Sequence, residues 1–267
     1  MSILIPIIAV TAIGLICGIM LVVASKFMAV PEDETFIKVR ECLPGANCGA
    51  CGYAGCDGYA HALSDGEIKE TNLCVPGGAD AAVHVAAAMG MEAQEVVPKV
   101  AYVACCGDRN CTTLRYDYKG IPSCKAANLL FSGDGMCTFG CLGYGDCANV
   151  CPNDAICIED GLARVKSSLC LGCGLCAKAC PNQLIHIAPA TVKTIIRCSN
   201  HDKGAVTRKA CTHGCIGCKK CEKECPSGAI TVVNNCAVIN YSKCTNCGHC
   251  AEVCTTGCIT ESCFQPV

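Results

Sequence analysis

Eight cysteines in this chain recur, with the same mutual spacing, 74 residues further along. The first copy runs from Cys137 to Cys180 and the second from Cys211 to Cys254. Both contain gaps of two and three residues, and runs of the form C-x2-C-x2-C-x3-C hold cubane iron–sulfur clusters. Two copies therefore predict four clusters in one polypeptide, and a chain with that many clusters carries electrons.

Each copy predicts a complete folding unit. Residues 156–165 and 230–239 lie between the cysteine runs and have the apolar character and central turn residues of β-hairpins. We therefore expect two tandem ferredoxin-like modules of the α+β class, over residues 137–190 and 191–263, with two [4Fe-4S] clusters each.

In such modules the fourth cysteine of one run ligates the cluster of the other run. The expected ligands of the first module are Cys137, Cys141 and Cys147 with Cys180, and Cys170, Cys173 and Cys176 with Cys151. Those of the second module are Cys215, Cys218 and Cys221 with Cys254, and Cys244, Cys247 and Cys250 with Cys225.

Two positions depart from this pattern. Tyr144 stands where the second copy has Cys218, so we expect Cys137 to serve as the missing ligand, while Thr255 replaces the usual proline after Cys254. The repeat also identifies spare cysteines, because a ligand is not replaceable by threonine or leucine. The spare cysteines and their equivalents are Cys157 with Thr231, Cys236 with Leu162, and Cys258 with Leu184.

A separate four-cysteine motif precedes the modules, within an expected domain at residues 32–97. Its spacing is C-x2-C-x4-C-x17-C, formed by Cys48, Cys51, Cys56 and Cys74. The glycines around these cysteines allow the backbone to wrap closely around an inorganic core. Four-cysteine zinc sites share the C-x2-C element, but the neighbouring modules favour a fifth [4Fe-4S] cluster. Helices are expected over 57–65 and 79–97.

Residues 98–136 are a connector, which we expect to be mostly strand, over 100–103 and 114–118. It contains Cys105, Cys106, Cys111 and Cys124. Their spacing matches no established motif, so they hold a sixth cluster or are structural or free thiols.

Residues 1–26 predict a membrane anchor. Ile3 to Ser25 has no charged residue and matches the ~20 residues that a helix needs to cross a bilayer. A cleaved signal peptide is the alternative, but no basic residue precedes the apolar run. Positive residues follow it, at Lys26, Lys38 and Arg40, so the positive-inside rule places the cysteine-rich domains at the cytoplasmic face of a bacterial inner membrane, behind a single transmembrane helix.

Composition agrees with clusters in a reducing compartment. The chain has 32 cysteines among 267 residues, and thiolate ligands persist only where thiols stay reduced. The formal charge is −2, and each four-thiolate cubane adds roughly two further negative charges. Nucleic acid is therefore not expected as a partner.

The chain resembles the B subunits of the Rnf complex, the ion-translocating ferredoxin:NAD oxidoreductase of bacteria. The resemblance rests on the order of the segments, on residues 43–56 and on the stretched run 137–147. It implies that the chain accepts electrons from soluble reduced ferredoxin and relays them to membrane subunits that hold flavins, iron–sulfur centres and NADH. Such a complex is a translocase coupled to Na+ or H+ transport.

Two other functions remain open from the sequence. The first is a membrane-anchored polyferredoxin that serves a different anaerobic reductase. The second is a non-redox zinc-binding structural protein. No nucleophile–base pair, phosphate loop or flavin motif is visible, so no substrate chemistry independent of a complex is expected.

Overall fold

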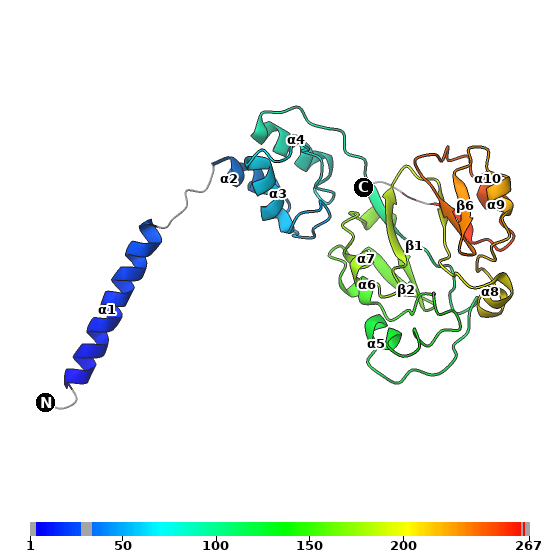
Figure 1. Ribbon diagram of the computed structural model, residues 1–267, viewed down its shortest axis with the longest axis horizontal. Helices are drawn as coiled ribbons and strands as arrows, with labels where there is room; N and C mark the ends of the chain where they lie inside the picture. Colours follow the sequence, from blue (N-terminus) through cyan, green and yellow to red (C-terminus); the bar gives the residue numbers. More distant parts are fainter. Residues whose placement is uncertain (1–3, 28–33, 263, 265–267) are drawn as a thin grey trace.

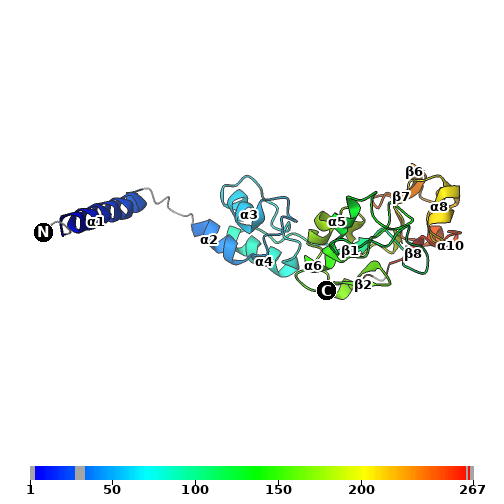
Figure 2. The same cartoon turned by 90° about the horizontal axis from the view of Figure 1, so that it is seen from below.

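The computed structural model describes residues 4–27, 34–262 and 264. It contains three parts along the chain: helix α1 (Leu4–Phe27), a small helical domain, and a larger body with four two-stranded sheets (Figure 1). The view from below shows the helical domain and the larger body side by side (Figure 2).

Helix α1 forms in the segment where we predicted a transmembrane anchor, at Ile3 to Ser25. Its side chains are described from Thr11 to Ala24 and are exposed. Among the described residues, no helix has both the length and the apolar character needed to cross a membrane, so the prediction of a transmembrane helix is wrong.

The small domain packs α2 (Glu34–Glu41), α3 (Gly55–Ser64) and α4 (Gly78–Met89) around one core. Helix α3 lies where a helix was predicted. Helix α4 is shorter than the predicted helix over 79–97, because Gly90 takes a left-handed φ of 66° and ends it. The largest fully buried side chains of this core are Val39, Tyr59, Leu63 and Val85.

The first module begins in the connector. Strand β1 (Lys99–Val103) pairs antiparallel with β4 (Ile185–Pro189), which confirms the strand predicted over 100–103. The hairpin β2 (Ile156–Glu159) and β3 (Leu162–Val165) is also confirmed. The strand predicted over 114–118 is wrong, because only an isolated bridge from Leu114 to Gly135 forms there. The short helices are α5 (Cys124–Asn128), α6 (Asp146–Asn149) and α7 (Leu175–Ala179), with a 3-10 turn at Ser167–Leu169.

The second module repeats this plan. Strand β5 (Thr194–Ile196) pairs with β8 (Ile259–Glu261), and the predicted hairpin forms as β6 (Ile230–Val233) and β7 (Cys236–Ile239). Its turn, Asn234-Asn235, has positive φ at both residues, as a two-residue turn between twisted strands requires. The helices are α8 (Gly204–Ala210), α9 (Lys220–Lys223) and α10 (His249–Glu252).

The connector also joins the two modules. Thr112 forms an isolated bridge with Cys211, and its hydroxyl donates to the carbonyl of Ala210 at 2.7 Å. The hydroxyl of Ser199 donates to the carbonyl of Ala104 at 3.1 Å. Residues 104–112 therefore lie against the start of the second module and close the space between the modules.

Candidate metal centres

The structure gathers most of the predicted ligands into groups of four cysteines, with one exchange. The N-terminal quartet is Cys48, Cys51, Cys56 and Cys74. Quartet A is Cys124, Cys141, Cys147 and Cys180, and quartet B is Cys151, Cys170, Cys173 and Cys176. Quartet C is Cys215, Cys218, Cys221 and Cys254, and quartet D is Cys225, Cys244, Cys247 and Cys250. Cys137, predicted for the set that contains Cys141, lies in a different cavity.

The N-terminal quartet is arranged by a loop rich in left-handed backbone. Asn47 has a φ of 46°, and its side-chain oxygen accepts from the N–H of Cys56 at 2.8 Å, which fixes the start of α3. A Cβ on Gly77 would lie 3.1 Å from the Cys74 sulfur, so only glycine leaves that side of the sulfur open. Burial and then the three neighbouring thiols raise the pKa of Cys74.

Quartet B lies between α7 and the β1–β4 sheet. The N–H of Ala101 donates to the Cys170 sulfur at 3.4 Å, and the N–H of Ala155 donates to Cys151 at 3.3 Å. Burial, followed by Cys170 and Cys173, raises the pKa of Cys176 to about 11. The four cysteines predicted from the spacing thus line one cavity.

Quartet A takes its fourth cysteine from the connector. Cys124 opens α5, where the Asp146 carboxylate accepts from the Ser123 hydroxyl and the Lys125 N–H, both at 2.9 Å, and ties α5 to α6. Cys124 therefore faces the cavity that Cys141, Cys147 and Cys180 line. Burial, then Cys141 and Cys124, raise the pKa of Cys147 to about 12.

Tyr144 explains why quartet A draws on a distant residue. It occupies the place of the second ligand of the run, and its hydroxyl donates to Asp134 at 2.7 Å while its ring packs edge-on against Tyr118. The spacing signal for Cys124 was absent from the sequence. Only the tyrosine at position 144 indicated that one thiol was missing from the run.

Quartets C and D lie in the second module, where the ligand run is complete. Burial, then Cys215 and Cys218, raise the pKa of Cys221 to about 11. In quartet D, burial and then Cys244 raise the pKa of Cys250, and the N–H of Asn246 donates to the Cys244 sulfur at 3.4 Å. Cys218 and Cys247 are exposed, so each quartet has one edge at the surface.

Two spare cysteines lie against quartet C. Cys236 and Cys258 are buried, as are their first-module equivalents Leu162 and Leu184. Cys258 lies 3.7 Å from the Cys254 sulfur, and this hydrogen bond lowers the pKa of Cys254 to about 4. Cys157, the third spare cysteine, is only partly buried and donates to the Glu159 carboxylate at 3.3 Å.

The quartets fit iron–sulfur cubanes chemically. Backbone N–H groups point at ligand sulfurs, a recurring feature of thiolate-bound clusters that adjusts their potentials. Burial and neighbouring thiols raise the pKa of Cys147, Cys176 and Cys221, so in these quartets four thiolates need a cationic core to coexist. No three or more His, Cys, Asp or Glu side chains among the described residues are arranged around a single metal ion. A cavity of about 20 Å³ lies among the thiols of each of quartets A, B and C.

Neighbouring quartets meet through short contacts. The Lys178 ammonium on α7 donates to the carbonyl of Cys48 at 3.0 Å, which brings the N-terminal quartet to quartet B. The pKa of Cys173 in quartet B is raised by burial first and then by Cys48. Cys147 of quartet A and Cys176 of quartet B belong to the same first-module core.

Three family models match parts of the chain. One described as "Putative Fe-S cluster" matches residues 43–76 and so spans the N-terminal quartet. A "4Fe-4S binding domain" matches 163–186, and a "4Fe-4S dicluster domain" matches 208–255. The matched segments contain cysteine runs of both modules.

Relatives match almost the whole chain. The B subunit of the Na(+)-translocating ferredoxin:NAD(+) oxidoreductase complex of Acetobacterium woodii is 44% identical over 260 residues, 97% of this chain and 78% of the relative. The B subunit of the proton-translocating ferredoxin:NAD(+) oxidoreductase complex of Clostridium ljungdahlii is 43% identical over 97% of this chain and 92% of its own length. The B subunit of the ion-translocating oxidoreductase complex of Methanosarcina acetivorans is 43% identical over 95% and 96%.

Proposed function

This chain belongs to the family of B subunits of ion-translocating ferredoxin:NAD(+) oxidoreductase complexes, and we propose that it relays electrons from reduced ferredoxin through five or more [4Fe-4S] clusters to other subunits. The complex is a translocase, and electron flow through it is coupled to Na+ or H+ transport. The chain itself binds and insulates the clusters and sets their potentials.

The observation that carries this proposal is the contiguity of the quartets. The N-terminal quartet adjoins quartet B through Cys48 and Lys178, and quartets A and B share the first-module core. Clusters that are held in this order pass single electrons from one to the next without any bond being formed or broken. Ion translocation needs such a controlled path, because electrons that bypass the clusters do not drive ion transport.

We propose the ligands as the members of the five quartets, with Cys124 in place of Cys137 beside Cys141. Support comes from the single cavity that the four cysteines of quartet A line. It also comes from the pKa of Cys147, which is raised by burial and then by Cys141 and Cys124. We place the N-terminal cluster domain at 32–97 and the boundary between the modules near residue 190, between β4 and β5.

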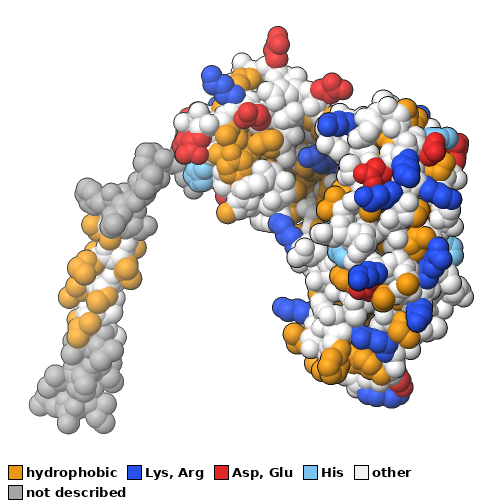
Figure 3. Space-filling model, turned by 45° about the vertical axis from the view of Figure 1, so that its right-hand side comes forward, with side chains coloured by type: hydrophobic (Ala, Val, Ile, Leu, Met, Phe, Trp, Pro, Cys, Tyr) orange, Lys and Arg blue, Asp and Glu red, His pale blue; other side chains and the backbone are white. Residues whose placement is uncertain are grey.

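The electron donor is proposed to dock at the second module. Lys219, Lys220 and Lys223 are exposed around Cys218, the surface edge of quartet C. Figure 3 shows Lys and Arg side chains spread over the visible face of the larger body. Ferredoxins carry negative charge around their clusters, so a basic rim next to a cluster would steer them. The partners at the other end of the relay are the membrane subunits of the complex.

An ion-translocating complex works across a membrane, so the chain is part of a membrane-bound assembly. We place the cysteine-rich domains at the cytoplasmic side, because thiolate ligands need a reducing compartment and soluble ferredoxin is the donor. Contacts with the other subunits then hold them at the membrane surface.

Membranes that lack this protein test the proposal. They should lose NAD+ reduction by reduced ferredoxin and the ion gradient that it drives, while NADH oxidation by artificial acceptors survives at the partner subunits. The purified chain alone should oxidise ferredoxin and yet fail to reduce NAD+. Deleted membranes that still reduce NAD+ with ferredoxin at the normal rate would instead favour a polyferredoxin of another reductase.

A further inference from the structure

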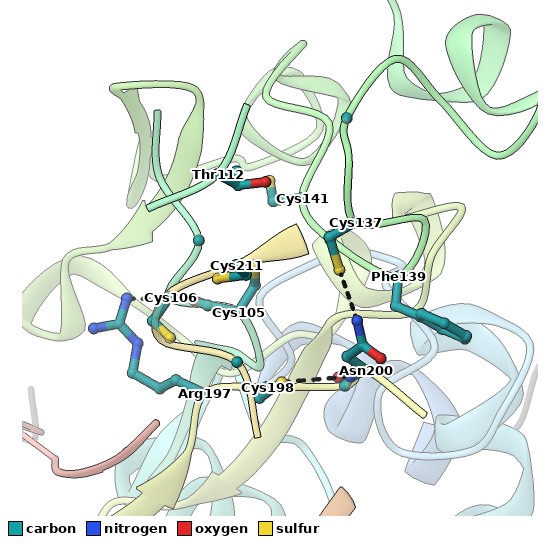
Figure 4. Close-up of a pocket in the computed structure, with 15 residues that line it drawn as sticks. Cys105, Cys106, Thr112, Cys137, Phe139, Cys141, Arg197, Cys198, Asn200 and Cys211 are labelled. Atoms are coloured by element: carbon teal, nitrogen blue, oxygen red, sulfur yellow. Dashed lines mark hydrogen bonds between the residues drawn. The ribbon is translucent and has the colours of Figure 1, made fainter. Parts of the chain in front are cut away.

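A cavity lies where the connector meets both modules, between quartets A and C. It is lined by Cys105 and Cys106 of the connector, Cys137 of the first module, and Cys198 and Cys211 of the second. Its volume is about 30 Å³, against about 20 Å³ for each of the cavities at quartets A, B and C. Figure 4 shows Cys137, Cys198 and Cys211 arriving at the cavity from three different segments.

Four of these sulfurs accept N–H hydrogen bonds, as the ligands of the quartets do. Cys137 accepts from the side-chain amide of Asn200 at 3.3 Å, and Cys198 accepts from the N–H groups of Asn200 and Cys215 at 3.5 and 3.2 Å. The backbone of Gly107 and Cys141 donates to Cys105, and that of His213 donates to Cys211. Such bonds favour thiolates and are a recurring feature of cluster sites.

Cys106 differs from the other four. Its sulfur donates to the carbonyl of His213 at 3.4 Å, a bond that only a protonated thiol makes. Cys106 is therefore left out of the proposed ligand set, whereas the adjacent Cys105, whose sulfur accepts backbone N–H groups, is included.

Glycines keep the space between the sulfurs open. A Cβ on Gly107 would lie 3.3 Å from the Cys211 sulfur and 3.7 Å from the Cys105 sulfur, and a Cβ on Gly140 would lie 3.7 Å from the Cys137 sulfur. Neither glycine has a positive φ, so close approach and not backbone conformation explains them. The cavity therefore has room for a group that contacts several of these sulfurs at once.

We propose that Cys105, Cys137, Cys198 and Cys211, the shared quartet, hold a sixth [4Fe-4S] cluster that bridges the two modules. Its role as a relay rests on the proposed electron-transfer function. Cys141 belongs to quartet A and also lines this cavity, while the N–H of Cys215 in quartet C donates to Cys198. Held by these four cysteines, a cluster would supply one-electron transfer between its two neighbours, one neighbour becoming oxidised and the other reduced, with no proton or bond exchanged.

The internal repeat accounts for the asymmetry of the ligands. Cys137 and Cys211 are equivalent positions, each four residues before the first cysteine of a run, and both reach the shared quartet. Cys124 and Cys198 are also equivalent, but Cys124 completes quartet A because Tyr144 has replaced a ligand there. Quartet C has its full set, so Cys198 is available to the shared site.

The test is iron analysis of the full-length protein, purified without oxygen. Six clusters require about 24 iron per chain, and five require about 20. A wild-type count near 20 overturns the shared quartet and leaves the proposed function standing, whereas the absence of iron overturns both. Cys211→Ala should lower the count by about four, while the matched variant Cys106→Ala should keep it. Equal counts in both variants would refute the assignment.

Thiol alkylation of the wild-type protein decides the same question without any variant that fails to fold. In the iron-loaded protein Cys137 and Cys198, which are partly exposed, should stay protected and should react once the iron is removed with chelator. Mass spectrometry of the peptides gives the positions. Reaction of Cys137 and Cys198 at the same rate with iron bound as after its removal would overturn the proposal.

Discussion

The side-chain amide of Asn200 donates a 3.3 Å hydrogen bond to the sulfur of Cys137, a residue that lies 63 positions earlier. Asn200 is buried, and its carbonyl oxygen accepts from the Asp202 N–H and the Thr207 hydroxyl, so the direction of its amide is fixed. This residue of the second module therefore draws Cys137 away from its own run and toward the shared quartet.

Asn200→Asp should weaken the shared cluster without removing a ligand. The carboxylate is nearly the same size as the amide, but it cannot donate to Cys137 and adds a negative charge beside it. We expect the shared cluster to have a lower reduction potential or to be lost, which electron paramagnetic resonance during a redox titration would measure. Asn240→Asp, on an exposed turn, is the control. Identical signals in Asn200→Asp and the wild type would show that the bond has no role.

Cys124→Ala should lose about four iron per chain, because it removes a ligand of quartet A. The loss should also destabilise the first module, since cluster binding is coupled to folding. Cys157→Thr is the matched control, because it copies Thr231 of the second copy and should keep all the iron. Full iron content in Cys124→Ala would return the role of fourth ligand to Cys137.

Cys258→Leu should keep its iron and lower the reduction potential of the quartet C cluster. The change copies Leu184, so the core stays filled, but the thiol that hydrogen-bonds to Cys254 is lost. Hydrogen bonds to cluster sulfurs stabilise the more negative, reduced form and so raise the potential. A redox titration compares the variant with wild type. A raised potential, or a loss of iron, would contradict this account.

Reversing the charge of Lys219, Lys220 and Lys223 to Glu should slow electron transfer from ferredoxin roughly tenfold or more at low salt, because steering governs association rates. High salt should reduce the difference. A control with the same charge change places Glu at the exposed residues Lys69, Lys119 and Lys166. Equal rates for the two triple variants would place ferredoxin docking elsewhere. Stopped-flow absorbance gives the rates.

Cluster assembly should release protons in a pH-dependent way. Without iron, burial raises the pKa of Cys147 to about 12 and that of Cys176 to about 11, so these thiols are neutral at pH 7. Clusters bind thiolates, so each cubane should displace the protons that its ligand thiols carry, and quartet C should release fewer because the pKa of Cys254 is already lowered to about 4. Apparent affinity for the cluster therefore rises with pH up to these values and falls on acidification. A pH-stat during reconstitution measures the release, and a value near zero at pH 7 would contradict buried neutral thiols.

Much of the cofactor-binding part could be predicted because its signals are local. Quartets B, C and D come from runs with gaps of two and three residues, and the structure places each set together. The hairpins were equally readable, since Asp160-Gly161 and Asn234-Asn235 suit turns that need positive φ. Such features depend on residues close in sequence, so spacing alone specifies them.

The partners of Cys105, Cys124, Cys137 and Cys198 were decided only by tertiary structure. The repeat makes Cys124 equivalent to Cys198, yet the two line different cavities. Tyr144 replaces a ligand in the first module, so quartet A needs Cys124, whereas quartet C of the second module is complete without Cys198. The pairing of β1 with β4 fixes the connector on the first module, and the contacts of Ala104 with Ser199 and of Thr112 with Cys211 bring it against the second. Sites assembled from distant segments leave no spacing signal, because their geometry arises only when strands and turns from separate modules have packed.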